Sequence, residues 1–189
     1  MLSERVVTDV LLAAMSTGGD FAEIFLEDTY NTQIRMLDGA VDEAVSGRDF
    51  GVGIRIFQGL KCVYAYTNEI DREGLIRTAR EAAAALHGAP AGRAVVLSRL
   101  AVERFNPVRL EPQQVPHQDK VEVMKRAHLA AAGFHHQITQ VAVSYLDVDQ
   151  NVFIANSEGL FVEDRRVRTR LSINAVASKD GEKQSAFRG

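Results

Sequence analysis

Residues 48–55, which read RDFGVGIR, are the first segment whose residue types suggest chemistry. They join an Asp-Phe-Gly triplet to two spaced glycines, as in the phosphate-binding parts of kinases, but the strand-borne lysine and the His-Arg-Asp motif are missing. A dinucleotide-binding fingerprint would need a third glycine where Ile56 stands. Phe50, Val52 and Ile54 instead alternate with the glycines at the period of a strand. We therefore expect a structural strand whose bare face lets a neighbouring element approach closely.

Residues 147–151 (DVDQN) and Glu158 match positions 1, 3, 5 and 12 of a calcium-binding loop. That loop needs glycine at its sixth position, where this sequence has Val152, and its flanks predict strands where the motif needs helices. A hairpin turn with the acidic residues in solvent is the favoured interpretation. His135 and His136 lack a companion ligand motif, and Cys62 has no neighbouring Cys or His. We expect no metal ligand and no catalytic residue in this chain.

Arg166, Arg168 and Arg170 occupy alternate positions, so on a strand they project from one face. A solvated face, or ion pairs with Glu163 and Asp164, is the ordinary interpretation of such a row. The alternative is a contact with a partner domain, a substrate carboxylate or nucleic acid. These three arginines are the candidate partner or substrate contact.

The bulk composition is that of a globular protein of one or two small units. The 189 residues are 46% apolar and 25% charged, and the net charge is −3. No apolar run is long enough for a membrane span, and neither the charge nor a motif marks a nucleic-acid binder. The single cysteine excludes an internal disulfide, and the N-terminal residues lack the features of a signal peptide. We expect a cytoplasmic protein.

Residues 1–88 predict a helix, an antiparallel meander and a covering helix. Apolar residues at helical spacing follow Ser3, a good N-cap. Asp38-Gly39 and Gln58-Gly59 are turn signals, the former typical of a type I′ hairpin. Period-two patterns predict strands at 21–28, 32–37, 40–46, 50–57 and 61–67, and a helix from Asn68 or Asp71 to about residue 86.

Residues 89–117 contain all four prolines and predict a surface connector. Residues 118–189 predict a helix over 120–134, with Met124 on its inner side, and then antiparallel strands. The strand candidates are 138–146, 152–156, 160–163, 167–178 and 183–187. The predicted fold class is α+β: an antiparallel β-meander covered by helices, followed by a second β-rich segment.

Several of these segments, in this order, resemble the N-terminal domain of the TldD/PmbA family. They are residues 20–27 (DFAEIFLE), 37–39 (LDG), 51–55 (GVGIR), 65–68 (AYTN) and 156–159 (NSEG), the last preceding the arginine-rich strand. Members were once called modulators of DNA gyrase and are regarded as metallopeptidases. The GVGIR segment followed by Tyr-Ala-Tyr is closer to the TldD branch than to the PmbA branch.

The resemblance implies that residues 1–189 form one compact N-terminal domain of a longer protein and that this domain has a non-catalytic role. In the family a C-terminal domain carries a helical His-Glu-x-x-x-His motif that binds zinc, and this sequence contains no such motif. Zinc is thus expected only in the full-length protein. Expected partners are a TldD/PmbA-type subunit in a homo- or heterodimer, a C-terminal catalytic domain and a peptide substrate. The chain would help to form the dimer and the wall of the peptide-binding chamber.

Two alternatives stay open at the level of sequence. The chain could be a stand-alone binding or regulatory module that pairs with a TldD/PmbA homologue. A nucleic-acid-associated protein is suggested only by the arginine strand and the family's older description, so nucleic acid is not an expected partner.

Overall fold

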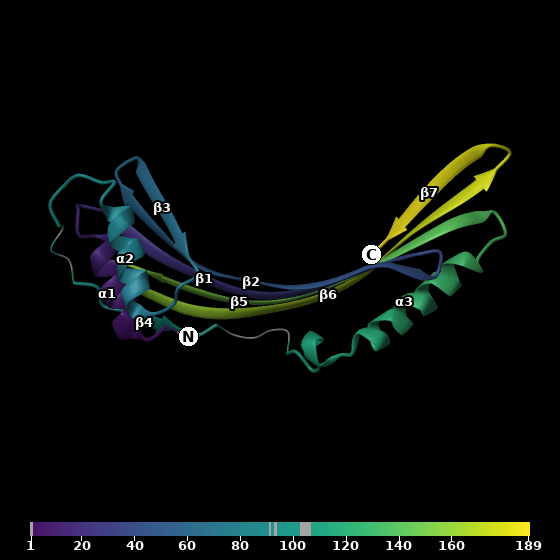
Figure 1. Ribbon diagram of the computed structural model, residues 1–189, viewed down its shortest axis with the longest axis horizontal. Coiled ribbons are helices and arrows are strands. Elements are labelled where there is room, and N and C mark those ends of the chain that lie inside the picture. The colour runs from purple at the N-terminus through teal and green to yellow at the C-terminus, as the bar shows by residue number, and fades with distance from the viewer. Residues whose placement is uncertain (1, 91, 93, 103–106) are drawn as a thin grey trace. The chain divides into compact units, whose positions relative to one another are not determined.

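The computed structural model describes residues 2–90, 92, 94–102 and 107–189 (Figure 1). Within them the helices are α1 (Glu4–Ala14), α2 (Arg72–Ala83) and α3 (His117–Ala132), with a short 3-10 turn at Pro112–Gln114. The strands are β1 (Phe21–Leu37), β2 (Ala40–Gln58), β3 (Lys61–Thr67), β4 (Ser98–Leu100), β5 (Ile138–Asn156), β6 (Leu160–Lys179) and β7 (Glu182–Arg188). These elements confirm the predicted α+β class.

The strands form one sheet in the order β3-β2-β1-β5-β6-β4, with β7 also paired to β6. β2 and β3 run antiparallel, from the pair Val52 and Thr67 to the pair Gln58 and Lys61. β6 and β7 are antiparallel as well, whereas the three-residue strand β4 is parallel to β6. The antiparallel meander predicted for the N-terminal half is therefore present, with β4 as a parallel addition.

The sequence-based strand breaks were wrong at four places. β1, β2, β5 and β6 each run unbroken through positions where polar residues had suggested an interruption, at 29–31, 47–49, 147–151 and 164–166. Polar residues do not end a strand if the backbone keeps its ladder bonds and the side chains find partners. The true turns carry positive φ angles, as at Asp38 and Gly39 (47° and 84°) and at Asp180 and Gly181 (51° and 85°).

The chain divides into two compact units that are interleaved along the sequence. The first unit contains residues 1–28, 49–105 and 151–165, and the second contains residues 29–48, 106–150 and 166–189, both considered over their described parts. The division of the sequence at a connector over 89–117 stays a prediction.

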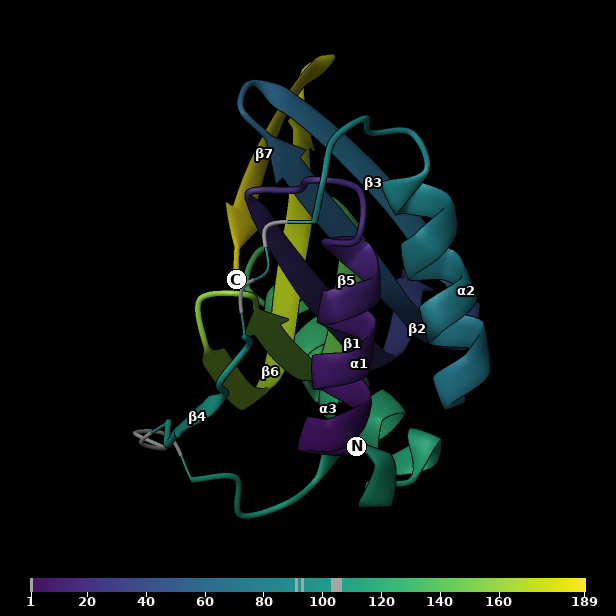
Figure 2. The same cartoon turned by 90° about the vertical axis from the view of Figure 1, so that its left-hand side faces the viewer.

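The first unit has an apolar core beneath two helices. α1 and α2 lie side by side (Figure 2), and Arg72 Nε donates to Asp9 Oδ2 at 2.8 Å between them. Both helices are amphipathic, so each buries one stripe against the strands. Fully buried members of this core include Val7, Val10, Leu11, Ile24, Ile54, Ile56, Leu75 and Phe161.

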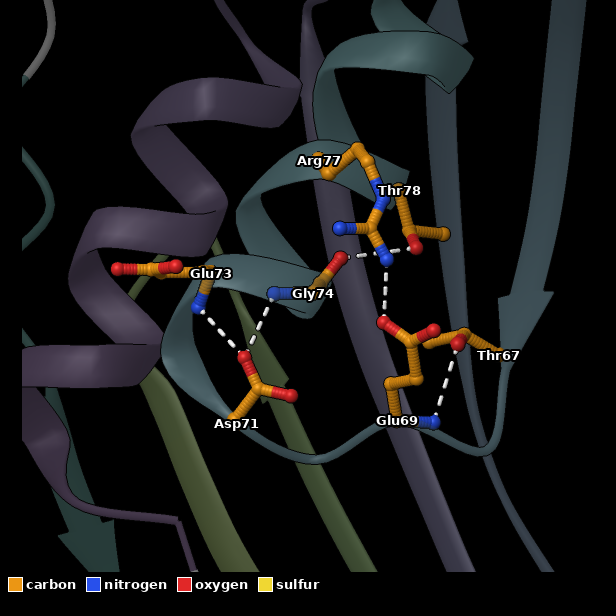
Figure 3. Close-up of polar contacts among 7 residues, drawn as sticks. All are labelled: Thr67, Glu69, Asp71, Glu73, Gly74, Arg77 and Thr78. Carbon is orange, nitrogen blue, oxygen red and sulfur yellow. Dashed lines mark hydrogen bonds and ion pairs between the residues drawn. The ribbon is translucent and has the colours of Figure 1, made fainter.

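The N-terminus of α2 is capped by Asp71, one of the two caps that the sequence predicts (Figure 3). Asp71 Oδ1 accepts hydrogen bonds from the backbone N–H groups of Gly74 at 2.9 Å and Glu73 at 3.1 Å. The Gly74 bond is the main cause that lowers the pKa of Asp71 below 3.8, because it favours the ionised carboxylate. An ion pair between Arg77 and Glu69 joins the first turns of the helix to the preceding loop. These contacts fix where α2 begins.

The second unit has a smaller apolar cluster beneath α3. Met124 is fully buried against residues of β1 and β5, among them Ile34, Met36 and Val143. The Asp38-Gly39 turn is held to β5, since Asp38 N donates to Val141 O at 2.9 Å and Val141 N donates to Asp38 Oδ1 at 2.8 Å. One aspartate therefore both forms the hairpin turn and attaches it to the neighbouring strand.

Candidate interaction surface on strand β6

Arg166, Arg168 and Arg170 lie exposed at alternate positions of β6. The predicted alternation is confirmed, so the three side chains share one face of the strand. Arg170 is partly fixed: its guanidinium carbon lies 5.8 Å from the ring centre of Phe187 on β7, within the range of a cation–π contact. Whether the row contacts a partner or a substrate stays a prediction.

The same part of β6 lies at an open edge of the sheet. β4 covers the edge only from Leu160 to Val162, and β7 covers it only from Ile173 to Lys179. Among the described residues, the stretch from Arg166 to Ser172 in the second unit has no strand beside it on that side. A part of an edge strand with no strand beside it can pair through its backbone with an added strand.

The opposite face of β6 is fixed by a buried polar network. Thr169 Oγ1 donates to Asp147 Oδ1 at 2.6 Å, and Tyr145 Oη donates to the same oxygen at 3.0 Å. Lys120 Nζ on α3 lies 2.6 Å from Asp147 Oδ2, and the Lys120 and Asp147 side chains are only 3% and 4% exposed. The network therefore connects α3, β5 and β6 within the second unit.

The pKa of the Tyr145 hydroxyl is shifted by its surroundings in this network. Burial raises its pKa to about 12, and the hydrogen bond to Asp147 adds to the rise, because ionised tyrosinate would lie in a poorly solvated place beside a carboxylate. The Lys120 ammonium lies 5.7 Å from the Tyr145 ring centre. With the tyrosine neutral over the physiological pH range, the network holds one buried cation against one buried anion.

Sequence reasoning missed this network, although a signal was available. Lys120 stands one helical turn before Met124, on the side predicted to face the sheet, and Asp147 continues the buried alternation of Val141, Val143 and Tyr145. The acidic segment 147–151 was expected to be a solvent-exposed turn, and this was wrong. Asp147 and Asp149 are each 3% exposed in the middle of β5. Each acidic side chain has partners that make its burial possible.

One glycine of the GVGIR segment, Gly53, has the architectural role that the sequence predicts for both. A β-carbon on Gly53 would lie 2.5 Å from Tyr64 Oη and 2.9 Å from Tyr64 Cε2. The tyrosine ring of β3 therefore occupies the space that the missing side chain leaves on β2. At Gly51 a β-carbon would make only an ordinary contact with Thr67 O at 3.5 Å. The close approach of the Tyr64 ring thus explains why residue 53 is a glycine. Nothing in the structure explains why residue 51 is one.

No three His, Cys, Asp or Glu side chains gather closely enough to hold a metal ion within the described ranges. His135 and His136 stack on each other with ring centres 4.3 Å apart, and Cys62 is exposed on β3. None of the described helices is both long and apolar enough to span a membrane.

Comparison with known proteins defines the class to which this fold belongs. Residues 22–86 match the first domain of the PmbA/TldA metallopeptidases, and residues 110–189 match their central domain. The two matches together take in most of the chain and follow the order of the family. The chain therefore belongs to the PmbA/TldA metallopeptidase family.

Two curated relatives show how much of the family architecture is present. The chain is 30% identical over 162 residues to a metalloprotease of Methanothermobacter thermautotrophicus, covering 84% of this chain and 34% of that protein. It is 25% identical over 171 residues to a TldD homologue, a metalloprotease of Haemophilus influenzae, covering 87% of this chain and 35% of that protein. The chain thus spans about a third of the length of these relatives.

Solved structures share the fold at lower identity. A protein of Bacteroides thetaiotaomicron described as a modulator of DNA gyrase superimposes with a TM-score of 0.74 at 18% identity, over 99% of this chain and 45% of that one. TldE from Thermococcus kodakarensis superimposes with a TM-score of 0.64 at 17% identity, over 90% of this chain and 39% of that one. At these identities the likeness concerns the fold.

Proposed function

We propose that the chain is the non-catalytic N-terminal part of a TldD-like zinc metallopeptidase, and that it helps to form the dimer and the wall of its peptide-binding chamber. The observation that carries this proposal is the match of residues 22–86 and 110–189, in order, to the first and central domains of the family. In this proposal the zinc is bound by the full-length protein of the family. We also assign the protein to the cytoplasm, in keeping with its single cysteine.

Within this function, the edge from Arg166 to Ser172 is the proposed contact with a partner subunit or an extended peptide. An added strand would pair with the backbone of β6, which recognises any sequence, while Arg166, Arg168 and Arg170 would favour carboxylates on one side. The buried network behind Thr169 would keep the edge in place when it pairs.

The proposal is tested by mixing the 189-residue chain with a full-length TldD/PmbA-type subunit and measuring the mass by size-exclusion chromatography with light scattering. We expect a complex of the two proteins, and no peptidase activity from the chain alone in the presence of zinc. The variant R166E/R168E/R170E should weaken the complex about 10-fold or more, because each charged contact contributes about 1.5 to 3 kcal/mol when it is desolvated.

The matched control is R80E/R126E/K179E, which changes the net charge equally at positions away from this edge. It should leave the complex intact. Zinc-dependent hydrolysis of peptides by the isolated chain would contradict the non-catalytic role. Failure of the chain to associate with any TldD/PmbA-type subunit would contradict the role in dimer formation. If the two triple variants weakened the complex equally, the β6 edge would not be the contact.

A further inference from the structure

The first unit has an aromatic groove of about 200 Å³ on the face of the sheet opposite its core. Val52 and Ile54 of β2 are buried in the core with residues of α1 and α2, so the glycines that alternate with them belong to the other face. Aromatic side chains from the two neighbouring strands line the groove there, namely Phe25 of β1 and Tyr64 and Tyr66 of β3. The two tyrosines are 61% and 79% exposed, so a ligand can reach their rings.

Gly51 lines the groove, although no contact within the described chain requires a glycine there. The ring of Tyr64 fills the space above Gly53, whereas a β-carbon on Gly51 would meet only Thr67 O at 3.5 Å, an ordinary contact. A glycine in the interior of a strand lowers stability, because it loses more conformational freedom on folding and has no side chain to pack. Bare backbone at such a position is expected where a group from outside the chain approaches closely.

The charge of the groove favours a cation. Glu27 and Asp49 line it together with the aromatic rings, and no Lys, Arg or His does. The faces of aromatic rings carry negative charge density, so rings and carboxylates attract the same kind of ligand. Both carboxylates already have partners in the protein, so they contribute attraction at a distance while the rings provide the contact surface.

Arg55 shows the same chemistry within the chain. It lies on β2 at an alternate position to Gly51 and Gly53, and therefore on the same face. Its guanidinium forms an ion pair with Glu23, and its guanidinium carbon lies 5.2 Å from the ring centre of Phe57. This face thus already holds one guanidinium between an aromatic ring and a carboxylate. The groove offers rings and carboxylates again, but no arginine is among the residues that line it.

The size and position of the groove favour a side chain of another polypeptide over a free small molecule. Its volume is below the range of about 300 to 1,000 Å³ that encloses small ligands, but it can take one side chain. β3 is the terminal strand of the sheet among the described residues, so a second backbone can lie beside the groove. A planar guanidinium stacks on aromatic rings better than an ammonium ion does.

We propose that this groove is a docking site for an arginine side chain of a partner polypeptide. The guanidinium stacks on the rings of Tyr64 and Tyr66 above the bare backbone of Gly51, and Glu27 and Asp49 attract its charge. The site depends only on residues of the first unit. It is therefore independent of the proposed role in a peptidase dimer, and either proposal can fail without the other.

The test titrates the 189-residue chain with three ligands and follows the shifts of its backbone amide resonances. The ligands are acetyl-Gly-Gly-Arg-Gly-Gly-amide, the same peptide with citrulline in place of arginine, and methylguanidinium. The arginine peptide should bind about 5 to 30 times more tightly than the citrulline peptide, because the uncharged citrulline lacks both the cation–π contact and the attraction to the carboxylates. Methylguanidinium should bind more weakly than the arginine peptide, and the shifts should occur at residues of the groove.

Two variants separate a role in binding from a role in folding. Gly51→Val should weaken the arginine peptide about 10-fold or more by filling the groove, without lowering the Tm, because valine favours strands. Tyr66→Leu, at an exposed position, should keep the fold and remove the preference for arginine over citrulline. Phe134→Leu is the matched control, since it changes an exposed aromatic residue outside the groove and should keep that preference.

Equal affinity for the arginine and citrulline peptides overturns the proposal, as does the absence of shifts at about 10 mM peptide, where even a ligand of millimolar Kd would bind. Methylguanidinium that bound as tightly as the arginine peptide would show a site for a free cation and would overturn the assignment to a polypeptide. Unchanged affinity in both Gly51→Val and Tyr66→Leu would mean that the peptide binds elsewhere, which also overturns the proposal.

Discussion

The two compact units bury different chemistry beneath their helices. In the first unit, α1 and α2 cover an apolar core in which Leu11 and Leu75 are fully buried. In the second unit, α3 buries only Lys120 and Met124 completely, and Lys120 is paired with Asp147. Burial of apolar side chains stabilises the folded state in proportion to the area removed from water. A buried ion pair adds little stability compared with an apolar pair of similar size, but loss of one partner is strongly destabilising because it leaves the other charge buried and uncompensated. The second unit should therefore tolerate fewer single substitutions.

The largest effect is expected from Lys120→Met. It leaves Asp147 buried and uncompensated, which should lower the free energy of unfolding by about 3 to 5 kcal/mol. Adding Asp147→Asn should recover most of this loss, because an amide oxygen can still accept from Tyr145 and Thr169 without a charge. Urea denaturation of the single and double variants measures both values. A double variant no more stable than Lys120→Met would mean that the charge is not the cause.

Leu11→Ala tests the apolar side of the comparison. Removing a fully buried leucine should cost about 2 to 5 kcal/mol through lost burial and a residual cavity. Hydrogen exchange should show faster opening of amides in the first unit for Leu11→Ala and in the second unit for Lys120→Met. If both variants speed exchange equally in both units, the two units unfold together and the comparison fails.

A smaller effect is expected from pH acting on Tyr145. Its pKa is about 12 in the folded protein and about 10 when unfolded, so folding retains the proton that the unfolded chain loses. The stability that depends on the neutral tyrosine is complete below pH 10 and should decline by about 2 to 3 kcal/mol as the pH rises to about 12. Denaturation curves across this interval measure the loss. Tyr145→Phe should lose less stability there, and Tyr66→Phe, at an exposed position, serves as the control.

The sequence predicted those features that depend on local rules. The burial of Val10 and Leu11 follows from helical spacing, and capping chemistry narrows the start of α2 to Asn68 or Asp71, of which the structure uses Asp71. The Asp38-Gly39 turn was predicted because a type I′ turn needs positive φ at both positions.

Features set by contacts between distant segments were not predicted. Nothing local to residues 147–151 shows that Lys120 supplies a buried cation to Asp147, so the acidic segment by itself predicts a turn. The Oε1 atom of Glu163 is buried without a hydrogen-bond partner among the described residues. This too depends on tertiary packing, because side chains from other segments cover the atom. The arginine row was predicted because alternation on a strand is local, whereas the open edge beside it was not, because strand pairing is not.

The exposed thiol of Cys62 makes the first unit accessible to spectroscopy without any substitution. It is the only cysteine of the sequence, and it stands opposite Phe57 in the antiparallel pairing of β2 and β3. The adjoining turn at Gly59 has open space around it, so an attached fluorophore would meet little obstruction on that side. A maleimide fluorophore on Cys62 would therefore report on the environment of the β2–β3 hairpin in the unaltered sequence.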